Sequence, residues 1–454
     1  MRLPFFDNDV QPHRTALINK DRSISYAKLI MSIKDWQNEL PLKEKGLVFL
    51  YLENSIEVVA PLLAVLEQGQ AVALLDINLS EEVKTELEEK YLPGILIFCQ
   101  DDIISYKINS PQGEPVNKDL CVLLSTSGST GSPKLVRLSK EAIKSNVFAI
   151  IASQNLDEGC RASGHLDIHY SYGMSVLFSH IAAGGSVSFS KNSFMERPFW
   201  AQIGEQNVTH LPGVPFHYEM LQRLRIERME LPSLMVMTQA GGRLDIEIQK
   251  YFHDMMAGKQ GRFLTMYGQT EASPRIATLQ HEDFEGNQGS VGQVMDGGLI
   301  TIRDKDGELL PVGTEGIVQY QGPNVMMGYA QNRADLSRGD DLGGVLLTGD
   351  IGVLDDRGFL TITGRHERMG KIYGWRINLD EVEKLSNQFI ASAVVQIGDE
   401  IVIAQEGNEE DSLRKLFANK TSLPASVFRF VTLETILRTK RGKIDYKSLE
   451  SDLS

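Results

Sequence analysis

The chain has 454 residues, of which 42% are hydrophobic and 23% are charged; this composition is typical of a folded globular protein and excludes a disordered chain. The formal net charge of −14 argues against a general nucleic-acid-binding or anionic-membrane surface, so any anion site must be local. The length exceeds that of one ordinary hydrophobic core and predicts a large domain with a smaller one.

The three cysteines, Cys99, Cys121 and Cys160, have neither metal-ligand nor redox-pair spacing. Such low usage favours buried free thiols in a reducing compartment. The N-terminus lacks the pattern of a secretory signal, and no stretch reaches the roughly 20 apolar residues that span a bilayer. We therefore expect a cytoplasmic protein without a membrane span.

Short apolar runs alternate with helical periodicity in the first part of the chain. Strands are expected at 47–52, 71–75, 94–98 and 120–124, and helices at 56–66, 81–91, 140–153 and 175–183. This alternation predicts an α/β class with parallel sheets covered by helices.

The pattern of apolar runs and glycines changes after about residue 289. Short runs punctuated by glycine, at 299–303, 316–320 and 359–363, predict the hairpins of a β subdomain. From about residue 367, the patterns predict a small α+β domain with helices at 379–389 and 411–419, strands at 391–397 and 401–404, and a basic tail.

The strongest local motif follows the apolar run 121–124. Glycines that let backbone amides approach an anion are combined there with hydroxyl donors and one lysine, which together suit a polyphosphate. A flexible Ser/Gly linker is the alternative from composition alone. The spacing, Gly-x-x-Gly-x-x-Lys, differs from that of P-loop nucleoside triphosphatases. The motif residues are Thr126, Ser127, Gly128, Ser129, Thr130, Gly131 and Lys134.

This string resembles the phosphate loop of the adenylate-forming superfamily, which includes acyl-CoA synthetases, peptide-synthetase adenylation domains and firefly-type luciferases. The run Tyr267-Gly268-Gln269-Thr270-Glu271 is similar to the superfamily's Tyr-Gly-x-Thr-Glu motif. The resemblance places Glu271 on Mg²⁺ and Thr270 at the α-phosphate, and Tyr267 offers a ring on which a base can stack. Upstream, Gly241 and Gly242 match the segment that lines the adenine and acyl pocket.

Three further motifs follow in the superfamily's order. Asp350, in Thr-Gly-Asp, and Arg365 match the two ribose contacts. The span 364–383 is similar to the hinge motif, in which Glu367 corresponds to the hinge acid and Gly374 to the glycine beside the pantetheine tunnel. Near the C-terminus, the segment 437–444 resembles the catalytic-lysine loop, which makes Lys443 the catalytic candidate together with Thr270 and Glu271. A solvated basic surface is the alternative for this last run.

The acyl pocket is predicted from the run around His169, Ser171 and Gly173. His169 matches a gate residue of similar acyl-CoA synthetases, although a satisfied core histidine is the alternative. Ser171 stands where amino-acid-activating relatives carry an Asp that binds the substrate ammonium. The absent Asp favours an aryl or aliphatic acid, while the nearby Asp167 keeps an amino acid open.

The resemblance implies a large N-terminal adenylate-forming body, residues 1–366, and a mobile α+β lid, residues 367–454. It implies ATP-dependent activation of a small carboxylic acid to an acyl adenylate, with Mg²⁺ as cofactor, followed by thioester formation with CoA. The alternatives are a stand-alone adenylation enzyme that loads a carrier-protein phosphopantetheine, and a non-catalytic nucleotide-binding scaffold. Neither a nucleic-acid partner nor a membrane partner is expected.

Overall fold

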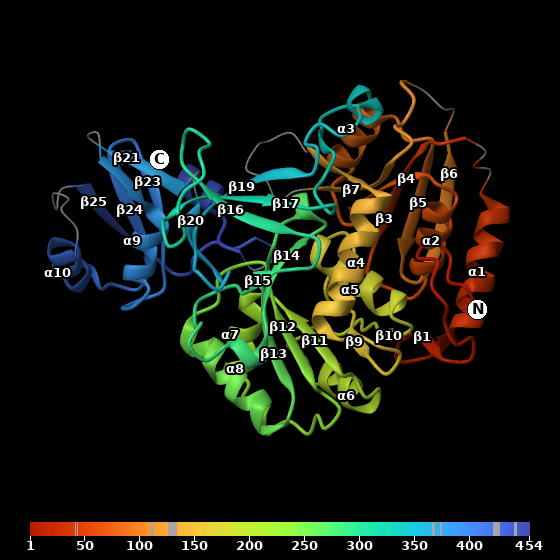
Figure 1. Cartoon of the computed structure of the whole chain (residues 1–454), viewed down its shortest axis with the longest axis horizontal. Helices are drawn as coiled ribbons and strands as arrows, with labels where there is room; N and C mark the ends of the chain where they lie inside the picture. The colour runs from red at the N-terminus through yellow and green to blue at the C-terminus, as the bar shows by residue number, and fades with distance from the viewer. Residues whose placement is uncertain are drawn as a thin grey trace. The chain divides into compact units, whose positions relative to one another are not determined.

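The computed structural model describes residues 1–40, 42, 44–109, 113–125, 134–365, 368–372, 375–420, 427–439 and 443–454. The phosphate-loop residues 126–131, Glu367 and Gly374 lie outside the described residues. The chain divides into two units, one made of Met1–Leu299 with Tyr320–Leu346 and the other of Ile300–Gln319 with Leu347–Ser454 (Figure 1). The mobile-domain boundary at residue 367 stays a prediction.

The described part of the first unit contains two large sheets. The nine-stranded sheet has the order β15-β14-β13-β12-β11-β9-β10-β1-β2, and the seven-stranded sheet has the order β18-β8-β7-β4-β3-β5-β6. The bounds of the first sheet are β1 Thr15–Ile18, β2 Ser23–Ser25, β9 Arg161–Ser163, β10 Ser186–Ser188, β11 His210–Gly213, β12 Val236–Gln239, β13 Arg262–Gly268, β14 Arg275–Leu279 and β15 Gln293–Val294. Those of the second are β3 Leu47–Leu52, β4 Ala71–Asp76, β5 Ile95–Gln100, β6 Ile103–Ile108, β7 Leu120–Ser125, β8 Leu135–Ser139 and β18 Gly328–Ala330.

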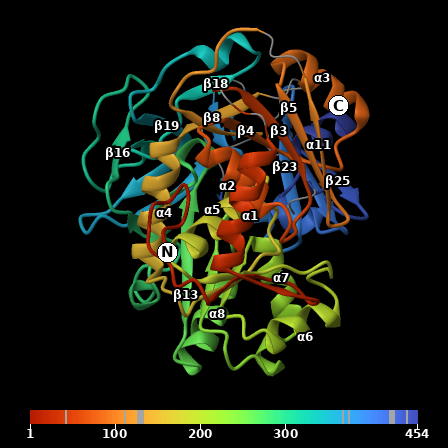
Figure 2. The same ribbon diagram turned by 90° about the vertical axis from the view of Figure 1, so that its right-hand side faces the viewer.

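Helices cover these sheets. The α-helices of the first unit are α1 Tyr26–Glu39, α2 Val59–Glu67, α3 Glu81–Tyr91, α4 Lys140–Gln154, α5 Ser171–Ala182, α6 Arg197–Glu205, α7 Pro215–Arg223 and α8 Ile246–Gly258, and the short 3₁₀ helices are η1 Ile226–Arg228, η2 Thr270–Ala272, η3 His281–Asp283 and η4 Ala334–Ser337. Helix α4 contacts β7 and β8 of one sheet and β14 of the other, and it packs on α5, so this pair lies between the sheets. Helices α1 and α2 pack together beside β4 (Figure 2).

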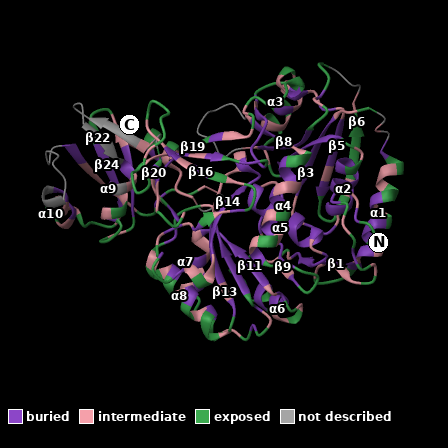
Figure 3. Ribbon diagram, in the orientation of Figure 1, coloured by how far each residue is buried: buried purple, intermediate pink, exposed green. Residues whose placement is uncertain are grey.

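The predicted parallel core is confirmed. Strand β3 is buried along its whole length and pairs in parallel with β4 and β5, whereas the edge strand β6 is antiparallel and largely exposed (Figure 3). Serine caps help to set the helix starts, because the side chains of Ser80 and Ser139 accept from the first turns of α3 and α4. Helix α5 begins at Ser171, earlier than the predicted residue 175. The small residues Ser171 and Gly173 do not indicate a helix in the sequence, but both are buried in its first turn.

The second unit contains the predicted β subdomain and the C-terminal α+β part. Strands β16, β17, β19 and β20 form one sheet, β21 and β22 pair, and β23, β24 and β25 form a third sheet. The bounds are β16 Leu299–Arg303, β17 Gly316–Gln321, β19 Val345–Leu354, β20 Leu360–Arg365, β21 Met369–Ile372, β22 Trp375–Asn378, α9 Leu379–Ser386, β23 Ser392–Ile397, β24 Glu400–Glu406, α10 Glu410–Lys420, β25 Phe428–Leu433 and α11 Tyr446–Leu453. Among the described residues, no helix combines the length and the apolar character needed to cross a membrane.

A buried ionic network holds the C-terminal part together. The guanidinium of Arg368 forms ion pairs with Asp380 and, at 3.0 Å, with Glu383 of α9. It also lies 3.8 Å from the centre of the Tyr446 ring, and the Tyr446 hydroxyl donates to Glu383 over 2.6 Å. Burial raises the pKa of Glu383 despite the neighbouring Arg368, so this carboxylate depends on its partners. The network therefore joins α9 to the start of α11, directly after the lysine loop.

Two histidines are buried between α5 and the nine-stranded sheet. His180 and His210 are 2% and 5% exposed, and their ring centres lie 5.1 Å apart. Burial lowers the pKa of His180 to about 4 and lowers that of His210 well below its ordinary value. Both side chains line a water-sized cavity together with Arg275. After burial, the charges of His180 and Arg262 also lower the pKa of His210.

The first prediction concerns Arg368. Replacing it in an Arg368→Leu variant leaves two partly buried carboxylates without their cation, and we expect a loss of about 3 kcal/mol in the free energy of unfolding, measured by urea denaturation. The matched control is Arg357→Leu in the same unit, which removes an Arg whose side chain is 58% exposed from its ion pair with Asp355, itself 38% exposed, and should cost less than about 1 kcal/mol. Equal losses in the two variants would contradict the role given to the network.

The second prediction concerns pH. Because the unfolded chain binds protons at histidine near pH 6.5 and folded His180 does so only near 4, unfolding takes up a proton between these values. The stabilisation is complete above pH 6.5 and falls by about 1.4 kcal/mol per pH unit for each such histidine as the pH decreases toward 4. Urea denaturation at pH 7.5, 6.5 and 5.5 measures the slope.

His180→Leu should reduce this slope by about 1.4 kcal/mol per pH unit, which corresponds to the uptake of one proton. Substitution of the exposed His13 should leave the slope unchanged. An unchanged slope in His180→Leu would show that the buried pair does not carry the pH dependence.

Candidate functional site

The predicted phosphate loop connects two neighbouring strands. Strand β7 ends at Ser125 and β8 begins at Leu135, and these two residues are paired in antiparallel register. Lys134 directly precedes β8. Strand β18 pairs with the other edge of β8 and places Tyr329 opposite Val136. The lysine and this tyrosine therefore come from adjacent strands of the seven-stranded sheet.

Tyr329 contacts two of the predicted site residues. The Nζ atom of Lys134 lies 3.9 Å from the centre of the Tyr329 ring, and the Tyr329 hydroxyl donates to Oε1 of Glu271 over 2.7 Å. The ring can stabilise the ammonium through its π face, and the hydroxyl orients the carboxylate. One tyrosine thus joins the predicted phosphate-binding lysine to the predicted Mg²⁺ ligand.

Backbone contacts fix the short helix that carries Glu271. The carbonyl oxygen of Glu271 accepts from Met326 N over 2.9 Å, and the Ser273 hydroxyl donates to the carbonyl oxygen of Asn324 over 2.8 Å. The segment before β18 therefore holds η2, which follows β13, against the seven-stranded sheet. The Thr270 hydroxyl of η2 lies 3.1 Å from the hydroxyl of Ser171, which brings the predicted α-phosphate contact next to the predicted acyl pocket.

Glu271 fits a hard cation. A carboxylate oxygen is the ligand type that Mg²⁺ prefers. The Tyr329 hydroxyl donates to Oε1, so the carboxylate is oriented and can present an oxygen to a metal ion. The fit agrees with the role that the sequence motif predicts for this residue.

The predicted acyl-pocket residues lie on the loop between β9 and α5 and on the first turn of that helix. Asn54, after β3, holds the loop through 2.8 Å and 3.2 Å bonds to Ile168 N and to the carbonyl oxygen of Gly164. At Gly173, a Cβ atom would lie 2.2 Å from the carbonyl oxygen of Asp167, so only glycine allows the loop to fold back onto the helix. His169 is half-buried in this loop, and its gate role stays a prediction.

The pair Gly241 and Gly242 follows β12 at the same edge of the nine-stranded sheet. Gly241 has φ +87°, and a Cβ atom there would lie 2.8 Å from the Tyr170 hydroxyl, so a side chain would collide with this tyrosine. Gly242 accepts from the Gln239 amide over 2.8 Å. Tyr267 and Gly268 end the neighbouring strand β13, and Gln269 follows directly. Tyr170 thus contacts the predicted adenine-binding glycine segment.

The buried residue Tyr172 connects the start of α5 to the sheet beside this glycine segment. The Tyr172 hydroxyl donates to the carbonyl oxygen of Thr238 over 2.8 Å, and the Arg275 guanidinium lies 4.8 Å from the centre of the Tyr172 ring. Burial raises the pKa of Tyr172 to about 12, so the phenol stays protonated and keeps donating. Helix α5 is thereby fixed to β12.

The second unit contains the remaining predicted residues. Asp350 on β19 is buried and forms a 3.2 Å ion pair with Arg365 on β20, directly across the hairpin. The two predicted ribose contacts are therefore neighbours. Lys443 lies in a second hairpin, where its carbonyl oxygen accepts from Thr439 N over 2.7 Å and Asp445 N donates to Leu437 O over 2.9 Å.

Sequence reasoning missed Tyr329, Arg368 and Tyr446. The signal for Tyr329 was available in the run Met-Gly-Tyr-Ala, where a polar aromatic residue follows a glycine. The contact itself joins residues 58 positions apart, which periodicity does not report.

Comparisons with known proteins agree with these motifs. A family model described as AMP-binding enzyme matches residues 6–330. The chain is 27% identical to 2-succinylbenzoate–CoA ligase of Bacillus cytotoxicus, over 85% of this chain and 82% of that protein. It is also 27% identical to tyrocidine synthase 1 and 25% identical to bacitracin synthase 3, over 98% and 97% of this chain. The chain spans only 44% of tyrocidine synthase 1, from Brevibacillus parabrevis, and 7% of bacitracin synthase 3, from Bacillus licheniformis.

Solved structures show the same fold. The o-succinylbenzoate CoA synthetase MenE of Bacillus subtilis, in complex with its acyl-adenylate intermediate, matches with a TM-score of 0.79 at 22% identity, over 97% of this chain and 96% of that one. ATP-bound MatB of Rhodopseudomonas palustris matches with a TM-score of 0.83 at 20% identity, over 99% and 97%. The chain therefore belongs to the family of AMP-binding enzymes, within the adenylate-forming superfamily that its motifs resemble.

Proposed function

We propose that the protein activates a small carboxylic acid with MgATP and then transfers the acyl group to the thiol of CoA. The observation that supports this proposal is that Tyr329 contacts both Lys134, a cation suited to phosphate, and Glu271, a carboxylate suited to Mg²⁺. The similarity to a protein named 2-succinylbenzoate–CoA ligase over most of both chains supports CoA as the acceptor.

In the first step, a carboxylate oxygen of the acid attacks the α-phosphorus of ATP and pyrophosphate leaves. Lys134 and Thr270 bind phosphate oxygens, Tyr267 stacks on the base, and Asp350 with Arg365 binds the ribose hydroxyls. Glu271 would hold Mg²⁺, and the ion would supply positive charge to the phosphates. Lys443 stabilises the charge that moves onto the leaving group.

In the second step, a thiolate attacks the carbonyl carbon of the acyl adenylate, the acyl–phosphate bond breaks, and AMP leaves. We propose that the part of the chain after residue 367 moves between the two steps, with Glu367 at the hinge and Gly374 beside the thiol path. Such exchange of catalytic groups by a mobile segment suits a two-step reaction with one site.

Ser171 bears on the class of acid. It offers a hydroxyl that lies 3.1 Å from the Thr270 hydroxyl, so a substrate ammonium at this position would lack a carboxylate partner. An ammonium without such a partner is costly to bury. Ser171 therefore favours an aryl or aliphatic acid over an α-amino acid, while the nearby Asp167 keeps an amino acid open.

A carrier protein is the second candidate acceptor. The chain is as similar to tyrocidine synthase 1 as to the CoA ligase, with 27% identity in both cases. The net charge of −14 disfavours a general anion-binding surface for the CoA phosphates. Thioester formation with free CoA, compared with a phosphopantetheinyl carrier, separates the two acceptors.

The third prediction is acid-dependent release of pyrophosphate. With MgATP and a panel of aryl, short aliphatic, fatty and amino acids, we expect release with one of the non-amino classes. Lys443→Ala and Glu271→Ala should each lower it at least about 100-fold, because each removes a charge that stabilises the transition state. A folded protein that binds ATP but releases no pyrophosphate with any acid would favour the scaffold interpretation.

The fourth prediction separates the two contacts of Tyr329. Tyr329→Phe keeps the ring beside Lys134 but loses the bond to Glu271, so the Mg²⁺ concentration for half-maximal pyrophosphate release should rise roughly tenfold. Tyr329→Leu also loses the ring, so the KM for ATP at saturating Mg²⁺ should rise as well.

The matched control is Tyr251→Phe, which removes another tyrosine–carboxylate hydrogen bond, to Glu227, in the same unit. It should leave the Mg²⁺ dependence as in the wild type. If Tyr329→Phe also keeps the wild-type Mg²⁺ dependence, then the hydroxyl does not position the metal ligand.

A further inference from the structure

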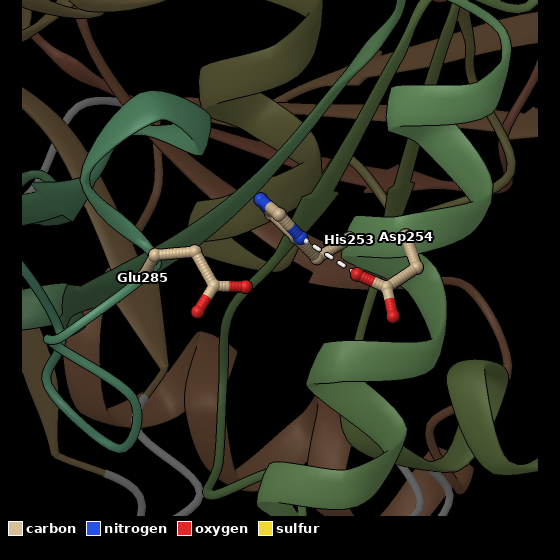
Figure 4. A group of neighbouring side chains, drawn as sticks. All are labelled: His253, Asp254 and Glu285. Carbon is tan, nitrogen blue, oxygen red and sulfur yellow. Dashed lines mark hydrogen bonds and ion pairs between the residues drawn. The ribbon is translucent and has the colours of Figure 1, made fainter.

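A cluster of three metal-ligating side chains lies in the first unit, apart from the residues assigned to ATP and the acid. One ligand atom each from His253, Asp254 and Glu285 lies within 4.8 Å of the others. His253 and Asp254 come from α8, and Glu285 comes from the loop after η3. Figure 4 shows the His253 ring between the two carboxylates.

In its Nε2–H tautomer, the histidine offers the Nδ1 lone pair to this cluster. Its Nε2 lies 3.2 Å from the carbonyl oxygen of His281, and a carbonyl accepts only, so Nε2 carries the hydrogen. In the neutral ring, Nδ1 then has the lone pair, yet it lies 3.2 Å from Oδ1 of Asp254, another acceptor. Two acceptors at this distance need a cation between them or a second proton on the ring.

The separation fits a zinc-type ion. With bonds of about 2.0–2.1 Å, the ligands of a tetrahedral zinc ion lie roughly 3.3 Å apart, close to the 3.2 Å between Nδ1 and Oδ1. Glu285 is exposed, so its side chain can move the remaining distance. Its loop therefore completes a set of three protein ligands.

Each of the three residues also has a second polar partner. His281 holds Nε2 of His253, Lys250 binds Oδ2 of Asp254 at 3.0 Å, and the Gln288 amide donates to Oε2 of Glu285 over 3.0 Å. Such outer contacts orient ligands in metal sites.

Packing holds the imidazole plane. The His253 ring is stacked with the rings of His281 and Phe284, at centre distances of 4.2 and 4.5 Å, and it is only 9% exposed. Its Nδ1 is therefore directed at the carboxylates before any ion binds, which reduces the ordering cost of binding.

We propose that His253, Asp254 and Glu285 bind one divalent transition-metal ion of the zinc class. The imidazole ligand favours zinc over Mg²⁺, which prefers oxygen ligands. The bound ion links α8 to the segment after β14 and stabilises this part of the first unit. The site does not depend on the proposed acid-activating function.

Zinc titration of the full chain without nucleotide tests the proposal. Isothermal titration calorimetry with zinc sulfate should show one site per chain, and zinc should raise the unfolding temperature in excess Mg²⁺. Glu285→Gln and Asp254→Asn should each weaken binding at least tenfold.

Two control variants should keep the wild-type zinc affinity. Glu282→Gln changes an exposed neighbouring carboxylate of η3 outside the cluster, and Glu271→Ala removes the proposed Mg²⁺ ligand. Wild-type zinc affinity in Glu285→Gln and Asp254→Asn, or no zinc binding by the wild type at about 1 mM, would overturn the proposal. Loss of pyrophosphate release alone bears only on the proposed function.

Discussion

The contact of Tyr329 with Lys134 and Glu271 is the interaction on which the candidate site depends. Lys134 directly precedes β8 of the seven-stranded sheet, whereas Glu271 lies in η2, which follows β13 of the nine-stranded sheet. A lysine and a carboxylate from separate sheets would each prefer water to a fixed place in a site. The tyrosine gives both a partner, with its π face for the ammonium and its hydroxyl for the carboxylate, so the polar groups are ordered before a nucleotide binds.

Parallel strands explain why the other predicted residues gather nearby in the first unit. Strands β9, β11, β12 and β13 run in the same direction, so their carboxyl ends lie at one edge of the sheet. The segments that follow them carry the acyl-pocket loop, the glycine pair and the Tyr267–Glu271 motif. Close backbone approach at Gly173 and Gly241 then sets the shape of this edge.

In the second unit, a network of partners holds charged side chains within a small α+β structure. Arg368 is shared by Asp380, Glu383 and Tyr446, so each buried polar group has a partner. Since Tyr446 begins α11 directly after the hairpin that contains Lys443, the same network anchors one end of that hairpin. The described residues that follow Lys443 are thus held by contacts that lie outside the lysine motif.

The sequence by itself determined the α/β class, part of the strand and helix positions and the identity of the motif residues, because apolar periodicity and glycine or hydroxyl runs are local properties. Strand 47–52 and helix 81–91 match the structure at both ends. Only the tertiary structure decided that Tyr329 joins Lys134 to Glu271, that Arg368 pairs with α9, and that Glu285 meets His253. These contacts depend on which strands and loops become neighbours after folding, and that long-range geometry has no periodic signal in the chain.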